Sequence, residues 1–567
     1  MAAVQEERFS RIKNDRAIPR RSFRFCLERG AISIANVDAI AFYEDPHLKL
    51  DRQLWMSLAE NIQPELKSSI VRRVTRESSI DELRRVLGYD GHIEIVDHHK
   101  SHAASAFYFS GFEEAAILTV DGVGDWPTTS YGWGRGTQLE RFEQVDFPHS
   151  LGLFYSAITG YLGFEVNEGE YKLMGLAPYG KPTYADRIRR LIEVGPAGQY
   201  RLNMQYFAFL KEECMYSEEL IALLGQPPRK PESQLTQFHM DVARSAQQVL
   251  EEVLLEKVRY LHGRCSSENL CMAGGVALNV VANARCLREG PFERLFVQPA
   301  AGDAGGALGA AAVANVVLAG ERPKSGLKHV YLGPGISSDG THRILQGTSA
   351  SFRDFRGREQ ALIDYTVEHL IQGRVIGWCT GPCEFGPRAL GARSILADPR
   401  RPDMRDVINA SVKKRESFRP FAPSVLESEQ RRHFDLDHPS PFMLETCQVV
   451  SALQLPSITH VDGSARVHSV DPETNPRFAA LLQAFFARTG CPMLLNTSFN
   501  MRGEPIVLDP VDALLCFAMS SIDVLILQDF GLERDAVTEL WQLMGQQRAQ
   551  PVRLPDARGR HLVYTFL

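Results

Sequence analysis

The sequence has no closely spaced cysteine pairs of the kind that bind zinc or build a disulfide framework. Its ten cysteines are scattered and no Cys-x-x-Cys occurs, so the most suggestive spacing is that between Cys379 and Cys383. A zinc ribbon and a small disulfide-rich secreted fold are therefore not expected. A reducing, cytoplasmic location suits this cysteine usage best.

Neither a signal peptide nor a membrane span is expected. The first residues, MAAVQEERFSRIKN, are charged from the fifth position onward, which a signal peptide does not allow. Residues 304–320 carry no charge, but they are rich in glycine and alanine and follow Asp303 directly. They predict a closely packed buried helix. We expect a soluble protein with no membrane partner.

An excess of positive charge is also missing. The net charge is −6, whereas a nucleic-acid-binding protein usually carries a basic domain or stripe. Basic clusters occur at residues 11–24 and 413–419, and either could simply be a solvated face. No nucleic-acid partner is expected.

The pattern of apolar residues indicates an α/β protein. A chain of 567 residues exceeds what one hydrophobic core usually organises, so two domains are expected. Short apolar runs alternate with helical patterns, and residues 241–261 predict a long amphipathic helix. A boundary is expected within residues 324–358. A second α/β pattern then covers residues 375–396 and continues to about residue 530, and a poorly ordered tail begins near residue 546.

Three predicted strands end in loops that contain an acid or paired glycines. The loops are Asp121-Gly122, Gly274-Gly275 and the run that begins at Asp303. Glycine lets backbone N–H groups approach phosphate oxygens, and an adjacent acid can bind a cation. Because each loop leads into a helix, we expect a nucleotide-binding cleft. Ordinary turns, with each aspartate as a helix N-cap, are the alternative.

Three histidines occur within five residues in DHHKSHAASAFYFSG, residues 97–111. His98 and His102 are four residues apart, so on a helix their rings leave from one face and could bind a single metal ion. The spacing alone is a weak pattern, and incidental histidines at a helix start are the alternative. With Asp121 and Asp303 added, two imidazoles and two carboxylates suit divalent iron, manganese or zinc. A metalloprotease is disfavoured because the chain contains no HExxH.

The second half of the chain is rich in cations placed beside glycine and proline turns. Arginine binds phosphate through a planar fork, and lysine does so as a point charge. Surface ion pairs are the alternative. The candidate cations are Arg388, Arg393, Lys413, Lys414, Arg419 and Arg466, and LNTSFN adds the neutral groups of Asn496, Thr497, Ser498 and Asn500.

Eight segments together resemble the O-carbamoyltransferase family, which includes nodulation-factor, cephamycin, ansamycin and tobramycin carbamoyltransferases. They are VQEERFSRIKND, VDHHKSHAASAFYFSG, LTVDGVGD, YKLMGLAPYGKP, MAGGVALN, FGPRALGARSILADPR, SFRPFAPSVL and LNTSFNMRGEPIV. They occur in order over nearly the whole chain, so the combination is specific.

The resemblance implies two domains of α/β class and a tail. Residues 1–345 would form an actin-like or sugar-kinase ATPase-type domain that transfers the carbamoyl group. Residues 346–540 would form a YrdC-like domain that makes carbamoyl-adenylate, and residues 541–567 would be the tail. Family members normally begin with a strand and a His-Asp loop ahead of the EERFSR segment. This sequence lacks both, and we expect reduced stability and impaired transfer as a result.

The resemblance also implies residue roles. The metal ligands would be His98, His102, Asp121 and Asp303, with Fe(II) as the expected ion and Mn(II) as the alternative. Phosphate and ATP contacts would fall on Arg388, Arg419, Arg466 and Asn496, and the catalytic set would be His98, His102, Asp121, Arg388 and Arg419. Further nucleotide contacts are expected at Gly122, Gly274, Gly275, Asn279, Lys413 and Ser498.

The implied reaction forms carbamoyl-adenylate and pyrophosphate from carbamoyl phosphate and ATP, and then carbamoylates a hydroxyl of a small molecule such as a secondary metabolite or a sugar. A tRNA-adenosine threonylcarbamoylation-type enzyme is one alternative, which the net charge of −6 disfavours. A truncated, non-catalytic nucleotide-binding protein is the other, because a fold alone does not establish activity. The chain could also form a homodimer.

Overall fold

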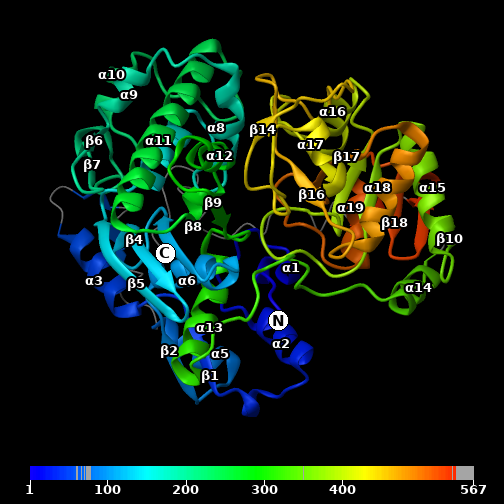
Figure 1. Cartoon of the computed structure of the whole chain (residues 1–567), viewed down its shortest axis with the longest axis horizontal. Coiled ribbons are helices and arrows are strands. Elements are labelled where there is room, and N and C mark those ends of the chain that lie inside the picture. The colour runs from blue at the N-terminus through cyan, green and yellow to red at the C-terminus, as the bar shows by residue number, and fades with distance from the viewer. Residues whose placement is uncertain are drawn as a thin grey trace. The chain divides into compact units, whose positions relative to one another are not determined.

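The computed structural model describes residues 1–58, 62–64, 67–68, 70–71, 78–348, 350–538 and 541–544. The chain forms two compact units, which are described separately here (Figure 1). The central unit consists of Ser33–Leu327, and the discontinuous unit combines Met1–Ile32 with the described residues from Lys328 to Met544. The division at Leu327 falls within residues 324–358, where a boundary was expected, and the first 32 residues group with the C-terminal part. The domain bounds that the resemblance implied, 1–345 and 346–540, stay a prediction.

Hydrogen bonds explain why the N-terminal segment belongs to the discontinuous unit. The segment contains α1 (Glu6–Ser10) and α2 (Arg20–Gly30). Arg8, which is 2% exposed, donates from Nη2 to the carbonyl oxygen of Gly386 at 2.7 Å. Arg11 donates to the carbonyl oxygens of Ile506 and Pro505, each at 2.7 Å. These partners lie far along the chain and carry no local pattern that would reveal the contact.

The central unit is built on a mixed five-stranded sheet of order β5-β4-β3-β8-β9. Strands β3, β8 and β9 are parallel to one another, and β4 and β5 form antiparallel neighbours. The strand bounds are β3 Glu114–Val120, β4 Pro127–Arg135, β5 Gln138–Asp146, β8 Asn269–Ala273 and β9 Arg294–Val297. Two smaller sheets accompany it: the parallel pair β1 (Ala39–Phe42) and β2 (His92–Ile95), and the antiparallel pair β6 (Ile192–Val194) and β7 (Tyr200–Leu202).

Helices α6 (His98–Ser110) and α13 (Asp303–Ala319) pack against each other in the central unit. Their backbones approach so closely that a Cβ atom on Gly309 would lie 1.9 Å from the carbonyl oxygen of Ser101. Residues 304–319 therefore form a helix that is closely packed at Gly309, as the sequence predicted. The helix is buried only in part, because Val317 and Leu318 are 60% and 56% exposed. None of the described helices combines the length and the hydropathy that a membrane-spanning segment needs.

The remaining helices of the central unit include the predicted long one, which runs as α11 over Gln237–Arg264. After β8 the chain makes a short 3-10 turn, η4 (Gly275–Leu278), and enters α12 (Val280–Glu289), which is the predicted order of strand, Gly-Gly turn and helix. The others are α3 Pro46–Ser57, α5 Ser79–Leu87, α7 Leu151–Tyr161, α8 Glu170–Leu176, α9 Ala185–Arg189 and α10 Glu218–Leu224.

The discontinuous unit contains an eight-stranded mixed sheet of order β10-β19-β18-β11-β12-β17-β13-β16. The strands are β10 Arg353–Asp354, β11 Ile376–Cys379, β12 Arg393–Ala397, β13 Ala422–Leu426, β16 His468–Val470, β17 Met493–Ser498, β18 Val524–Leu527 and β19 Phe530–Glu533. A short separate pair, β14 (Cys447–Gln448) and β15 (Ser464–Ala465), completes the strands described here.

Helices pack on this sheet around one apolar core that includes Trp378, Phe485 and Phe517, all fully buried. They are α14 Ser338–Gln346, α15 Glu359–Ile371, α16 Met404–Val407, α17 Gln430–His433, α18 Pro476–Thr489 and α19 Pro510–Met519. Both units are therefore α/β, as expected. The finer descriptions, actin-like for one unit and YrdC-like for the other, stay predictions.

Candidate functional site

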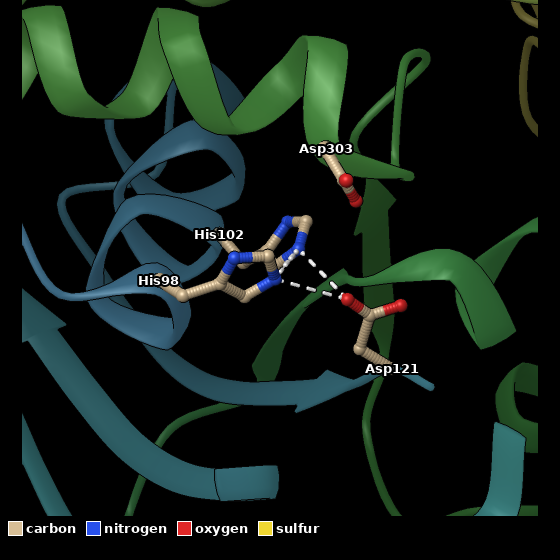
Figure 2. Close-up of side chains that lie close together, drawn as sticks. All are labelled: His98, His102, Asp121 and Asp303. Atoms are coloured by element: carbon tan, nitrogen blue, oxygen red, sulfur yellow. Dashed lines mark hydrogen bonds and ion pairs between the residues drawn. The ribbon is translucent and has the colours of Figure 1, made fainter. Parts of the chain in front are cut away.

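Four side chains converge beside the sheet of the central unit (Figure 2). Because β3, β8 and β9 are parallel, the loops at their carboxyl ends lie along one edge of the sheet. Asp121 follows β3, and Asp303 begins α13 after β9. His98 and His102 project from the first turns of α6 toward both carboxylates.

The ligand atoms of this cluster are close enough to bind one ion. His98 Nε2 lies 3.0 Å from Asp121 Oδ2 and 3.0 Å from His102 Nε2, and His102 Nε2 lies 3.3 Å from the same carboxylate oxygen. One ligand atom from each of the four residues lies within 4.8 Å of all the others. Two ligands at right angles around an ion, with bonds of about 2.1 Å, would be about 3 Å apart. The donor set and its spacing therefore fit a divalent transition metal.

Local structure fixes the direction of each ligand. Asp97 caps α6 by accepting the backbone N–H of Lys100, and Asp125 accepts the N–H of His98, each at 2.8 Å. Asp121 points Oδ2 at the histidines, while its Oδ1 accepts the N–H of Gly275 at 2.9 Å. The chain can pass this close only with glycine at position 274, where φ is +95° and a Cβ atom would lie 2.2 Å from the Val120 carbonyl oxygen.

The electrostatics of the cluster favour a bound cation. Loss of water around its carboxylate inside the cluster raises the pKa of Asp303, although the residue as a whole is exposed, and the negative charge of Asp121 raises it further. Burial lowers the pKa of His98, but the hydrogen bond and charge of Asp121, with help from Asp303 and Asp125, outweigh it and raise the pKa to about 9. His98, His102 and Asp121 are at most 5% exposed, whereas Asp303 is exposed, so solvent reaches the cluster on the Asp303 side.

The third histidine of the motif has a different role. His99 is fully buried, and its Nδ1 lies 2.6 Å from the hydroxyl of Thr119 on β3. Burial lowers its pKa well below the usual value, and the neighbouring His98 and His102 lower it further. His99 is thus a neutral packing residue, and the structure brings only two of the three histidines to the cluster.

Two predicted nucleotide contacts have structural roles. Asn279 caps α12 by accepting the N–H of Ala282, and its amide exchanges two further hydrogen bonds with Gln247, each at 3.0 Å. The carbonyl of Gly122 accepts the hydroxyl of Ser150 at 2.6 Å. The amide nitrogen and oxygen of Asn279 therefore already have hydrogen-bond partners within the protein. A ligand contact at either position stays a prediction.

A second site lies in the discontinuous unit, where arginines gather with few counter-charges. Burial lowers the pKa of Arg388 to about 10, and the like charge of Arg419 adds to this effect. Burial also lowers the pKa of Arg466 well below its usual value, and Arg388, Arg415 and Arg419 reinforce the shift. The Nε atoms of Arg388 and Arg466 are buried and have no hydrogen-bond partner among the described residues. Glu416 pairs with Arg419 at 3.8 Å.

Lys413 lies beside the predicted polar residues of the LNTSFN segment. Its Nζ donates to the side chain of Ser498 at 3.2 Å and to the side-chain oxygen of Asn500 at 2.7 Å. Burial lowers the pKa of this lysine well below its usual value, and Arg415 lowers it further. Lys413 and Ser498 are therefore brought together, as expected for members of one site.

The structure also corrects and extends the predicted cation set. Arg393 is fully buried and donates to the backbone carbonyls of Leu508 and Thr380, so it holds loops together and faces no ligand. Arg415, which directly follows the two lysines at 413–414, joins the arginine group without having been predicted. Glu384 was not predicted either; its Oε1 accepts three backbone N–H groups between residues 390 and 393 and so shapes the loop that carries Arg388.

Two models of known protein families match this chain. A family model described as Carbamoyltransferase N-terminus matches residues 1–312, and one described as Carbamoyltransferase C-terminus matches residues 367–534. The chain belongs to the carbamoyltransferase family. The predicted family and class of enzyme are thereby confirmed.

Several relatives of this carbamoyltransferase cover most of its length. An uncharacterized protein of Synechocystis is 44% identical over 94% of this chain and 93% of its own. Nodulation protein NolNO of Sinorhizobium fredii is 37% identical over 100% of this chain and 81% of its own. The 3'-hydroxymethylcephem-O-carbamoyltransferase of Amycolatopsis lactamdurans is 30% identical over 64% of each chain. Among solved structures, T. kodakarensis HypF aligns with 16% identity and a TM-score of 0.25 over 46% of this chain and 44% of its own, which is too low to support any argument.

Proposed function

We propose that this protein is an ATP-dependent O-carbamoyltransferase that makes carbamoyl-adenylate in the discontinuous unit and transfers its carbamoyl group in the central unit. The acceptor is a hydroxyl of a small molecule. The observation that carries the proposal is the group of four partly buried arginines Arg388, Arg415, Arg419 and Arg466. Burial and the like charge of Arg419 lower the pKa of Arg388, and burial and the like charges of the other three lower the pKa of Arg466. The Nε atoms of Arg388 and Arg466 are buried and have no partner among the described residues. Such a group is stabilised by a bound polyanion.

The first half-reaction is adenylation. Carbamoyl phosphate is cleaved by water to carbamate and phosphate, and a carbamate oxygen then attacks the α-phosphorus of ATP and displaces pyrophosphate. The arginine forks bind the phosphate oxygens, where negative charge accumulates in the transition state. Lys413 and Ser498 lie in the same unit and would complete the phosphate contacts.

The second half-reaction is transfer to the acceptor. The hydroxyl oxygen attacks the carbonyl carbon of carbamoyl-adenylate, the hydroxyl proton is lost, and AMP leaves. His98, His102, Asp121 and Asp303 would hold a divalent ion, Fe(II) or Mn(II), which supplies Lewis acidity to the reacting group. The two histidines present Nε2 toward Asp121, at 3.0 and 3.3 Å from its Oδ2.

Carbamoyl-phosphate-dependent exchange of pyrophosphate into ATP tests the proposal without knowledge of the acceptor. The wild-type protein should catalyse exchange. Arg419→Ala should reduce it by roughly 100-fold or more, because it removes a charged donor from the phosphate site. Arg432→Ala is the matched control, since its side chain is 74% exposed and pairs only locally with Glu429.

His102→Ala separates the two half-reactions. His102 lies in the central unit, so the variant should keep pyrophosphate exchange within about twofold of wild type. Carbamoyl transfer to a panel of sugar and hydroxymethyl acceptors should be lost. Absence of exchange in the wild-type protein would contradict adenylation. Loss of exchange in a folded His102→Ala protein would contradict the division of labour between the units.

A further inference from the structure

The basic segment of residues 413–419 follows an unusual helical turn. Helix α16 continues directly into η5, a π-helix over Ile408–Lys413, and the chain then turns at Lys414, where φ is +49°. Turns of the π type are rare and often occur at functional sites, and a lysine in the left-handed region is strained. Strain of this kind persists only where surrounding contacts hold the backbone in place.

One buried asparagine supplies several of those contacts. Asn409 lies in η5 and is 2% exposed. Its backbone carbonyl accepts the N–H groups of Lys414 and Arg415, the second at 3.0 Å. In its side chain, Oδ1 accepts from Nε of Arg415 at 2.8 Å, and Nδ2 donates to the carbonyl of Arg419 at 3.2 Å. A single residue therefore holds both ends of the segment that carries these two arginines.

The orientation of this amide follows from its partners. A guanidinium can only donate and a backbone carbonyl can only accept, so Oδ1 must face Arg415 and Nδ2 must face the carbonyl of Arg419. The guanidinium of Arg415 also contacts an aromatic ring, because its central carbon lies 4.7 Å from the centre of the Phe421 ring, and Phe421 is 3% exposed. The amide and the ring together restrict this side chain to one orientation.

We propose that Asn409 is a positioning residue of the adenylation reaction, and that its amide holds Arg415 and Arg419 as one rigid unit aligned with the charge that develops on the phosphate oxygens of ATP. The inference rests on the proposed function and gives Asn409 itself no contact with a ligand. Both arginines belong to the arginine group, because their like charges act on Arg466. Alignment matters because donors that are fixed in advance need no reorganisation when the transition state forms.

Kinetic constants separate this role from a purely structural one. A misaligned guanidinium still attracts ATP, but it no longer meets the developing charge, so the rate should suffer more than binding. For Asn409→Ala we expect the kcat of carbamoyl-phosphate-dependent exchange to fall about 10-fold, with the KM for ATP within about threefold of wild type. A purely structural role would reduce the amount of folded protein and leave kcat per folded molecule unchanged.

A double-mutant cycle tests whether Asn409 acts through Arg415. Arg415→Ala should itself lower kcat by roughly 10-fold or more, because it removes a charged donor. Asn409→Ala, introduced into that variant, should lower kcat by no more than about threefold further, since the amide then has no guanidinium to orient. Two residues that acted independently would instead show the full loss of about 10-fold again.

Asn269→Ala is the matched control. Asn269 is a buried asparagine of the central unit whose Nδ2 also donates to a backbone carbonyl, that of Glu114 at 2.8 Å. This variant should keep exchange within about twofold of wild type. Asn409→Leu, which keeps the volume of the side chain but neither hydrogen bond, replaces Asn409→Ala in all measurements if the alanine variant does not fold.

Three results would overturn the inference. The first is an unchanged kcat in a folded Asn409 variant, the second is a rise in the KM for ATP with kcat unchanged, and the third is a pair of losses that multiply in the double variant. All three require exchange by the wild-type protein. Its absence would instead overturn the proposed function, so the two failures are distinguishable.

Discussion

Asp121 uses its two carboxylate oxygens for two different purposes. One faces both histidines of the cluster, and the other accepts the N–H of Gly275 after β8. A substitution at this position would disturb the loop as well as the cluster. Asp303 is the better position for a test, because it is exposed and its replacement by asparagine keeps the shape while it removes one charge.

Metal content tests the cluster directly. The purified protein should contain about one first-row transition ion per chain, as expected for two imidazoles and two carboxylates. His98→Ala and Asp303→Asn should each lose the ion after dialysis, as measured by elemental analysis. His47→Ala changes an exposed histidine outside the cluster and should keep it. Full occupancy in both cluster variants would show that the ion, if present, is bound elsewhere.

The sequence predicted this cluster better than the arginine site, for a physical reason. The i, i+4 spacing of His98 and His102 and the acids at strand ends are local patterns, and parallel strands bring such ends together. Arg415 reaches its neighbours through a turn at Lys414, where φ is +49°, and no local pattern predicts that conformation. The hydrogen bond between Asn279 and Gln247 was likewise not predictable, because Gln247 lies on helix α11, which is distant in the sequence.

At the scale of elements, the pair α6 and α13 determines whether the cluster can form. His98 and His102 lie on α6, and Asp303 is the first residue of α13. The close approach at Gly309 sets the distance between the two helices. A larger residue at this point would therefore change both the stability of the central unit and the separation of the metal ligands.

Gly309→Ala should lower the melting temperature and reduce metal content. The added methyl group would overlap the Ser101 carbonyl, and overpacking of this kind costs about 1–3 kcal/mol. Gly263→Ala is the matched control, because it is a glycine of helix α11 with no atom within 4 Å of the added Cβ. That variant should be neutral or slightly stabilised, since alanine is the better helix former. Equal melting temperatures for the two variants would argue against the close packing.

Helices and strands whose apolar residues recur at a regular spacing were predicted from the sequence. The assignment of chain segments to the two units was not predicted. The stripe of apolar residues over 241–261 predicted α11, and the apolar runs predicted β3, β8 and β9. The docking of α1 depends on arginine side chains that donate hydrogen bonds to backbone carbonyls. Such contacts leave no regular spacing of residues in the sequence. Residues 11–24, read as a basic face, belong to that N-terminal segment.

At the scale of the whole molecule, the N-terminal segment contributes to a site assembled from residues far along the chain. Arg8→Ala should lower carbamoyl-phosphate-dependent exchange about 10-fold, because it leaves the Gly386 carbonyl without its buried donor and loosens the loop that carries Arg388. Arg24→Ala, whose side chain is 71% exposed, should leave exchange unchanged. If the Arg8→Ala protein catalysed exchange at the wild-type rate, α1 would contribute to packing alone and not to the phosphate site.

The interrupted connectivity of the discontinuous unit also governs the order of events during synthesis. Met1–Ile32 leaves the ribosome before the central unit, but its partners begin only at Lys328, after the whole central unit has been made. At about 5–20 residues per second, the intervening roughly 300 residues take on the order of 15–60 s to translate. The central unit can fold during that interval, whereas Arg8 and Arg11 must wait, with their final hydrogen bonds unmade, until the last third of the protein has emerged.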